Sequence, residues 1–483
     1  MVFNSVDFAI FLVVVFIGYW FVTYKNLKLQ NLFIVSASYY FYGLWNWQFL
    51  FVRLFSTFVD YKVGLLISNE KKKYKRKLFL WISIVINLGL LFFFKYNNFF
   101  LENFFTVFSF LGTFEKHNSL NIILPLGISF FTFQSIGYCI DVYKGKTIPT
   151  KDFIAFSAFV TYFPQLVAGP IERANALLPQ FLRKRNFEYD KAIDGLRQIL
   201  WGLFKKIVIA DNCANYANFS FNYNTIYSSE LVIGAILFGV QLYADFSGYS
   251  DIAIGVSRLF GINLNRNFAF PFLSRNMAEF WSRWHISLTT WFRDYLFLPM
   301  VKLNKSRGRF RISVILFIQF ILIGLWHGAN WTYVVWGIIN AIFLLPLVLN
   351  PKKVRYTTIV AYGKVFPTWS EFFKIIKTYI LIVFSIIFFR SKTIYEALIY
   401  VKYIFTLSIF TFPAHFMSKN FITTMLLVVF FFAVEWNGRE KQYAIENLGD
   451  NWKSAYRYGF YYLLIFFIFL FKAPYQQFIY FQF

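Results

Sequence analysis

Apolar stretches of membrane-spanning length recur along the whole chain, and no other feature constrains its fold so strongly. A helix needs about 20 apolar residues to cross the hydrocarbon core of a bilayer. Several windows are short or interrupted, and further ones lie near 51–68 and 99–113. We predict an all-α polytopic membrane protein with roughly 11–14 transmembrane or re-entrant helices. The clearest windows lie near 6–23, 31–50, 79–95, 122–140, 152–169, 194–211, 231–246, 312–327, 331–349, 374–389, 420–435 and 458–471.

The composition agrees with a membrane location. Of the 483 residues, 58% are hydrophobic and only 15% are charged. A soluble domain carries about 25% charged residues. The sequence shows no internal repeat, no low-complexity linker and no soluble segment. We therefore expect one integral-membrane domain over residues 1–483, surrounded by the lipid bilayer.

Basic residues gather in the short loops between apolar windows. The net charge is +25, and Lys and Arg cluster at 70–77, 183–191, 302–311 and 351–355. This is the positive-inside pattern, so we expect these loops in the cytoplasm and no nucleic-acid partner. No Lys or Arg precedes the first window, whereas Lys25 and Lys28 follow it, which predicts an N-terminus outside.

The two cysteines predict packing rather than chemistry. Cys139 and Cys213 lie within or beside apolar windows. Two such residues make neither a disulfide framework nor a metal site. We expect both to be buried and expect no bound metal.

One of the four histidines lies at membrane depth. His117 and His415 fall in loop-like segments, where structural roles are expected. His327 ends an apolar run from Ile312, which spans roughly 24 Å as a helix. An ionisable residue at that depth is costly and indicates function. The alternative is a core imidazole hydrogen-bonded to a neighbouring helix.

The segment 279–297, EFWSRWHISLTTWFRDYLF, is too charged to span a bilayer and unusually aromatic. Its aromatic residues recur at helical spacing, which predicts an amphipathic helix lying at the membrane interface. His285 then lies on or beside the inward face, with Arg293 and Asp294 mostly opposite. A simple interfacial anchor has the same pattern. The inward stripe comprises Trp281, Trp284, Leu288, Trp291 and Tyr295.

Just upstream, residues 243–276 are rich in Asp, Ser, Asn, Arg and Gly at apolar depth. Irregular polar backbone is tolerated there only inside protein or beside a water-filled cavity. Residues 243–330 are therefore predicted to line a catalytic cavity at which both His285 and His327 are aimed. The supporting candidates are Asp245, Ser247, Asp251, Trp284, Arg293, Asp294, Trp326 and Asn330.

Three stretches of this segment resemble the membrane-bound O-acyltransferase superfamily: DFSGYSDIAIG at 245–255, FWSRWHISLTTWFRDYLFLP at 280–299 and GLWHGANWTYVVWG at 324–337. The resemblance extends over essentially the whole chain and is closest to the bacterial alginate O-acetyltransferase-like branch, which includes peptidoglycan O-acetyltransferases. A sister branch transfers D-alanine to teichoic acids. The second Asp of DFSGYSD favours the acetyl-transferring branch.

The resemblance implies a ring of membrane helices around a central catalytic tunnel. It places the superfamily histidine at His327 and the second catalytic position at His285. It also implies a bacterial cytoplasmic (inner) membrane location, acetyl-CoA as a cytoplasmic donor and no tightly bound cofactor. The acetyl group would pass to an extracytoplasmic SGNH-type partner that acetylates a surface polysaccharide.

The residues suggest roles in such a transfer. The sequence lacks a G-x-S-x-G elbow and any Cys near the histidines, which argues against a covalent serine-hydrolase scheme. We hypothesise that His327 is the general base for the acceptor hydroxyl. His285 would orient the thioester or polarise its carbonyl. The basic loop 302–311, with Arg283 and Arg293, is a candidate site for the CoA phosphates, but positive-inside charge explains most of these residues.

The C-terminal tail, residues 472–483, offers an acceptor. Pro474 ends the last apolar helix, and the final six residues, FIYFQF, hold four aromatics. A free chain end is seldom so apolar, so we expect the tail to dock into protein. Its ending is similar to an aromatic-x-Tyr end on a partner peptide of the alanyl-transfer system. Tyr480 is therefore the acyl-acceptor candidate, although an interfacial aromatic belt has the same composition.

Three other functions fit parts of the sequence. A transporter also has buried polar residues and broken helices, but it should show paired halves, which this sequence lacks. A scaffold could recruit an extracytoplasmic enzyme without using the histidines. The alanyl-transferring relative would need a D-alanine carrier protein as its donor.

Overall fold

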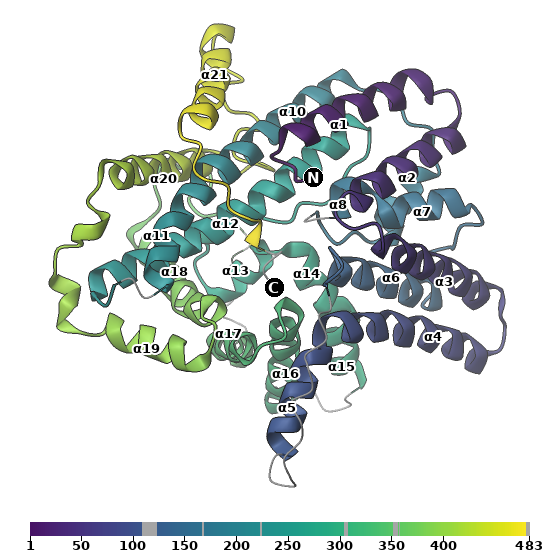
Figure 1. The fold of residues 1–483 in the computed structure, drawn as a ribbon, viewed down its shortest axis with the longest axis horizontal. Helices are drawn as coiled ribbons and strands as arrows, with labels where there is room; N and C mark the ends of the chain where they lie inside the picture. Colours follow the sequence, from purple (N-terminus) through teal and green to yellow (C-terminus); the bar gives the residue numbers. More distant parts are fainter. Residues whose placement is uncertain are drawn as a thin grey trace. The chain divides into compact units, whose positions relative to one another are not determined.

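The computed structural model describes residues 1–108, 123–166, 169–222, 225–303, 308–350, 356 and 358–479. Within these ranges every regular element is a helix (Figure 1), which confirms the all-α prediction. The chain divides into two compact units, each described by itself below. The single domain expected over 1–483 stays a prediction. The first unit comprises Met1–Glu188, Leu259–Leu264 and Gly328–Asn330, and the second comprises Tyr189–Arg258, Asn265–His327 and Trp331–Phe483.

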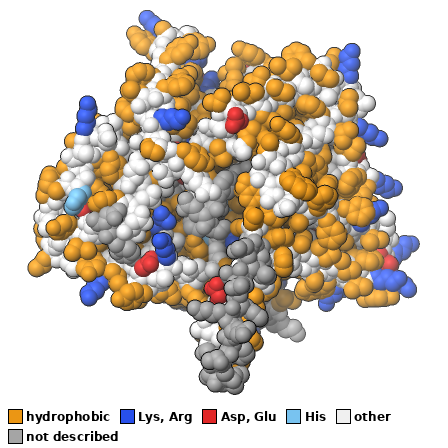
Figure 2. Space-filling model, viewed as in Figure 1, with side chains coloured by type: hydrophobic (Ala, Val, Ile, Leu, Met, Phe, Trp, Pro, Cys, Tyr) orange, Lys and Arg blue, Asp and Glu red, His pale blue; other side chains and the backbone are white. Residues whose placement is uncertain are grey.

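The protein is a multi-span membrane protein. Among the described residues, six helices are long and apolar enough to cross a bilayer, and Val6–Val22 and Ser454–Leu470 are shorter apolar helices. Figure 2 shows hydrophobic side chains over much of the face in view. Several predicted windows fold into shorter pieces, as at 152–169. The six long helices are Lys73–Phe108, Ser228–Leu259, Arg309–His327, Trp331–Leu349, Trp369–Arg390 and Lys419–Asn437.

The first unit is built from the N-terminal helices. A buried carboxylate, Asp60 on α3, joins three of them: Ser83 and Asn87 on α4 donate to it at 2.7 and 2.9 Å, and Cys139 on α6 lies against it. Such polar contacts hold helices together where lipid gives no hydrophobic drive. The helices are α1 (Val6–Ile17), α2 (Leu27–Gly43), α3 (Phe49–Asn69), α4 (Lys73–Leu91), α5 (Asn97–Phe108), α6 (Ile128–Tyr143), α7 (Phe153–Thr161), α8 (Phe163–Leu166) and α9 (Ala174–Phe181).

The second unit contains the segments that the sequence analysis singled out. Its central element is α12, a 32-residue helix. Its helices are α10 (Tyr189–Leu203), the π-helix η4 (Phe204–Ala210), α11 (Asp211–Phe221), α12 (Ser228–Leu259), α13 (Met277–Arg283), α14 (Ile286–Phe292), the π-helix η6 (Arg293–Phe297), α15 (Leu298–Leu303), α16 (Arg309–His327), α17 (Trp331–Leu349), α18 (Trp369–Arg390), α19 (Ile394–Ile404), α20 (Lys419–Asn437) and α21 (Ser454–Leu470).

Helices α10 and α12 touch backbone to backbone through paired glycines. A Cβ on Gly202 would lie 2.6 Å from the Gly248 carbonyl oxygen, and one on Gly195 would lie 2.6 Å from that of Gly255. Small residues are the usual way in which membrane helices approach this closely. The contact brings η4, which continues α10, against the polar half of α12.

The sequence analysis expected irregular backbone from residue 243, and this expectation was wrong for its first part. Helix α12 continues through Asp245 and Asp251 to Leu259. The polar side chains do not break the helix because lysines on η4 pair with both carboxylates. Irregular backbone begins at Phe260 and continues to α13, interrupted by the 3-10 helix η5 (Pro271–Leu273).

Candidate active site

His285 lies at a break between two short helices. Helix α13 ends at Arg283 and α14 begins at Ile286, so the continuous helix predicted over 279–297 is wrong. His285 adopts a left-handed backbone, with φ 42° and ψ 54°, a conformation that is rare and costly outside glycine. Asn267 stabilises the break: its carbonyl accepts from Ile286 N at 2.9 Å, and its side chain accepts from Ser287 Oγ at 2.9 Å.

The His285 ring is buried among aromatic rings. Its centroid lies 4.7 Å from that of Phe246 on α12 and 5.8 Å from that of Trp326 on α16. The residue lies outside the long apolar helices, yet it is only 1% exposed. Burial lowers the pKa of His285 to about 3. The imidazole is therefore neutral at physiological pH.

His327 is the last residue of α16 and is also buried, as predicted from its depth. Its ring centroid lies 4.9 Å from Trp326 and 5.1 Å from both Trp336 and Phe389. Trp326 thus contacts both histidines. We call His285, Trp326, His327, Trp336 and Phe389 the histidine–aromatic cluster.

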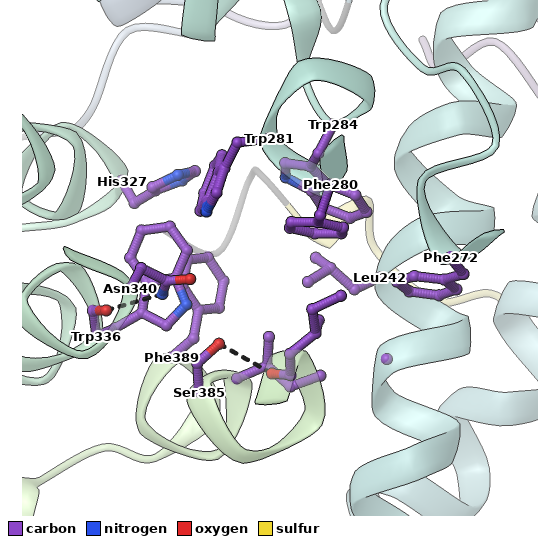
Figure 3. Close-up of a pocket in the computed structure, with 13 residues that line it drawn as sticks. Leu242, Phe272, Phe280, Trp281, Trp284, His327, Trp336, Asn340, Ser385 and Phe389 are labelled. Carbon is purple, nitrogen blue, oxygen red and sulfur yellow. Dashed lines mark hydrogen bonds between the residues drawn. The ribbon is translucent and has the colours of Figure 1, made fainter. Parts of the chain in front are cut away.

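A cavity of about 20 Å³ opens beside His327. This is room for about one water molecule. Figure 3 shows the His327 ring pointing toward Trp281, with Trp284 and Phe280 farther along the wall. The polar side chains of Asn340 and Ser385 donate to carbonyls of their own helices. The lining residues are Gly239, Leu242, Phe272, Phe280, Trp281, Trp284, His327, Trp336, Asn340, Ile382, Ser385, Ile386 and Phe389.

Two of the predicted supporting residues lie at this centre. Trp284 lines the cavity and stacks on Phe280, with centroids 5.5 Å apart and planes 22° apart. Trp326 bridges the two histidines. Aromatic walls of this kind are stiff because each ring is held by several neighbours.

Ser247 and Asp251 belong to a separate polar network on the η4 side of α12. Lys205 donates to Ser247 Oγ at 2.9 Å and pairs with Asp251, and Gln198 donates to Asp251 Oδ1 at 2.8 Å. Neither predicted residue lines the cavity. They hold η4 and α10 to α12 instead.

Asp245 is buried and holds both a lysine and the C-terminal tail. Lys206 Nζ lies 2.9 Å from Asp245 Oδ1. The main-chain N–H of Ile479 donates to Asp245 Oδ2 at 2.8 Å. Phe478 is fully buried. The tail is docked as far as Ile479, as expected from its composition.

Arg293 and Asp294 do not line the cavity. Arg293 and Asp294 pair with each other at 2.8 Å, and their side chains are 56% and 32% exposed. Asn330 lies in the short link before α17 and groups with the first unit. Tyr480 lies outside the described residues, as does His117. His415 pairs with Glu230 at 3.0 Å, in agreement with a structural role.

The sequence analysis missed Lys205 and Lys206. Both are buried and contribute the cations that pair with Asp251 and Asp245. The sequence contained a signal for them, because two adjacent lysines inside the apolar window 194–211 need carboxylate partners. Asn267, which stabilises the break at His285, had no comparable signal.

The site lies in a segment of the chain that matches a known protein family. Residues 147–389 match the model of the MBOAT, membrane-bound O-acyltransferase family. The matched segment contains η4, α12 and both histidines of the cluster.

Several relatives share most of the chain. It is 38% identical to the probable alginate O-acetylase AlgI of Pseudomonas aeruginosa, over 73% of this chain and 69% of that protein. It is 36% identical to the peptidoglycan O-acetyltransferase of Helicobacter pylori, over 71% of this chain and 70% of the relative. The teichoic acid D-alanyltransferase of Bacillus subtilis is 32% identical over 47% of this chain and 60% of its own length. The chain therefore belongs to the membrane-bound O-acyltransferase family and is an acyltransferase.

Proposed function

We propose that this acyltransferase moves an acetyl group from cytoplasmic acetyl-CoA across the membrane, for O-acetylation of a cell-surface polysaccharide. One observation carries the proposal. The rings of His285 and His327 both contact the ring of Trp326, inside the segment that matches the family. The choice of acetyl is supported by the O-acetylating relatives, which match about 70% of the chain, whereas the D-alanyltransferase matches 47%.

His327 is the proposed general base. Its imidazole would take the proton of an acceptor hydroxyl while the hydroxyl oxygen attacks the thioester carbonyl carbon. The tetrahedral intermediate would then collapse with cleavage of the C–S bond, and the imidazolium would return its proton to the leaving CoA thiolate. The cavity beside the ring supports this role, because it leaves space for a reacting group against an imidazole that is otherwise packed by aromatic rings.

His285 is the proposed orienting group for the thioester carbonyl. A neutral imidazole can donate one N–H to an oxygen that gains negative charge, and such a donor is most effective in a dry site. The low pKa and the aromatic surroundings of His285 support this role. Its left-handed backbone places it in the break between α13 and α14.

Tyr480 is the proposed acceptor. Its phenol would carry the acetyl group as an ester until an extracytoplasmic SGNH-type partner transfers the group to the polysaccharide. Docking of the tail as far as Ile479 supports this assignment.

We place the protein in a bacterial cytoplasmic (inner) membrane with its N-terminus outside and its basic loops at the donor side, without a tightly bound cofactor.

The test is transfer of label from acetyl-labelled acetyl-CoA to the purified protein, compared with His327→Ala. We expect CoA release and label on the protein, both lost in the variant. Tyr480→Phe keeps the ring and removes the accepting hydroxyl, so both the label on the tail and the coupled release of CoA should fall; wild-type acetylation by this variant would end the carrier assignment. Label on a D-alanyl carrier substrate and none from acetyl-CoA would assign the protein to the alanyl-transferring function of its Bacillus subtilis relative.

A further inference from the structure

Figure 1 shows the C-terminal chain continuing beyond α21, and between Phe471 and Ile479 its main chain is hydrogen-bonded at three points. Asn212 Nδ2 donates to the carbonyl of Phe471 at 2.8 Å. Lys206 Nζ donates to the carbonyl of Gln476 at 2.9 Å. The N–H of Ile479 donates to Asp245 Oδ2 at 2.8 Å. Contacts through peptide groups fix which residue lies at each point, so they set the register of the tail.

Lys206 is the centre of this arrangement. Lys206 Nζ donates to Asp211 Oδ1 at 2.8 Å and to the Gln476 carbonyl at 2.9 Å, and the ammonium group forms an ion pair with Asp245 at 2.9 Å. Lys206 is 1% exposed. A buried ion pair adds little net stability, although breaking it is costly, and its best-attested use is to fix one arrangement among several. Here the arrangement that it fixes includes the tail.

The docked tail reaches the surroundings of His285. The ring of Phe478 packs on Tyr249 at 4.1 Å and on Phe246 at 5.9 Å. Phe246 also packs on His285 at 4.7 Å. A single ring, that of Phe246, therefore contacts both the tail and the histidine–aromatic cluster. The amide that Asp245 holds belongs to the residue directly before Tyr480.

We propose that Lys206 and Asp245 form a latch that sets the register of the C-terminal tail and thereby the reach of its acyl-accepting residue. They are positioning residues, because they grip the peptide backbone and do not touch the reacting atoms. The proposal rests on the proposed function of Tyr480. Its physical part, docking by the latch, is measurable without any acyl transfer.

Ile479→Pro is the sharpest variant because proline removes the N–H that Asp245 accepts and leaves the buried charges intact. Ile479→Ala is its matched control, since it loses the side chain and keeps the N–H. Gln477→Pro, at an exposed neighbouring position, controls for backbone stiffening. Asp245→Asn tests the latch from the other side, because the amide oxygen still accepts while the charge facing Lys206 is lost.

Two measurements on the full-length protein separate docking from chemistry. Hydrogen exchange of the peptide from Lys472 onward reports docking, and label from acetyl-CoA on that peptide reports acceptance. We expect Ile479→Pro to raise exchange and to cut the rate of tail labelling by at least tenfold. Ile479→Ala should have a smaller effect, and Gln477→Pro should match the wild type. Asp245→Asn should raise exchange as Ile479→Pro does.

The outcomes are distinct. Unchanged exchange in both Ile479→Pro and Asp245→Asn would overturn the latch, whether or not the tail is labelled. Raised exchange with unchanged labelling would overturn its role in positioning. A wild-type tail without label would overturn Tyr480 as carrier, and exchange alone would then decide whether the latch exists.

Discussion

At the level of single residues, the proposed general base His327 gives the most specific prediction for the acyl-transfer rate. Replacement by Gln keeps a hydrogen-bonding group of similar size and removes the ability to take a proton. We expect His327→Gln to lower the acyl-transfer rate by about 10²–10⁴-fold, the usual contribution of a general base. The thermal unfolding midpoint should change little. A variant that transfers at the wild-type rate would show that the imidazole serves packing alone.

His285 should make stability depend on pH. Its folded pKa is about 3, and an unfolded His has a pKa of about 6.5. Between these values the unfolded chain binds the extra proton, so stability is full above about pH 6.5 and is lost as pH falls toward 3, by up to about 1.4 kcal/mol per unit.

His285→Asn is the matched variant for this effect, because Asn tolerates the left-handed backbone and does not titrate in this range. Thermal unfolding in detergent at pH 7 and pH 5 should show a smaller loss for the variant than for the wild type. Equal losses would mean that other groups carry the acid sensitivity.

At the level of elements, the glycine contact between α10 and α12 should be sensitive to a single methyl group. Gly202→Ala places a Cβ 2.6 Å from the Gly248 carbonyl oxygen, and overpacking of this kind costs about 1–3 kcal/mol. Gly459→Ala in α21 is the matched control because no atom lies within 4 Å of the added Cβ. We expect a lower unfolding midpoint for Gly202→Ala only. Equal unfolding midpoints would show that the added methyl group does not destabilise the contact between α10 and α12.

Sequence periodicity predicted the elements better than the contacts between them. The apolar run before His327 predicted the helix that ends at that residue, because its length is that of a membrane-spanning helix. The break at His285 escaped prediction because aromatic spacing of three and four continues across it. The compensating hydrogen bonds come from Asn267, a residue with no local pattern. Asp245 and Ile479 are 234 residues apart, and no local pattern predicts such a contact.

For the whole molecule, the basic loops predict the side on which the donor acts. CoA is highly charged and does not cross lipid, so the proposed donor, acetyl-CoA, would reach the protein from the cytoplasm. Inverted membrane vesicles should transfer label from external acetyl-CoA, whereas right-side-out vesicles should do so only after permeabilisation. His327→Ala vesicles provide the background. Equal labelling of sealed vesicles of both orientations would contradict the proposed topology.

The cavity beside His327 also has a consequence for acyl-chain length. Its volume of about 20 Å³ is close to that of one small group, and its walls are indole and phenyl rings held by their neighbours. An acetyl group adds a single methyl beyond the carbonyl carbon. Each further methylene would have to displace a ring, at a cost typical of overpacking. For the proposed acetyl transfer, we therefore expect the cavity beside His327 to favour a two-carbon acyl group over longer ones.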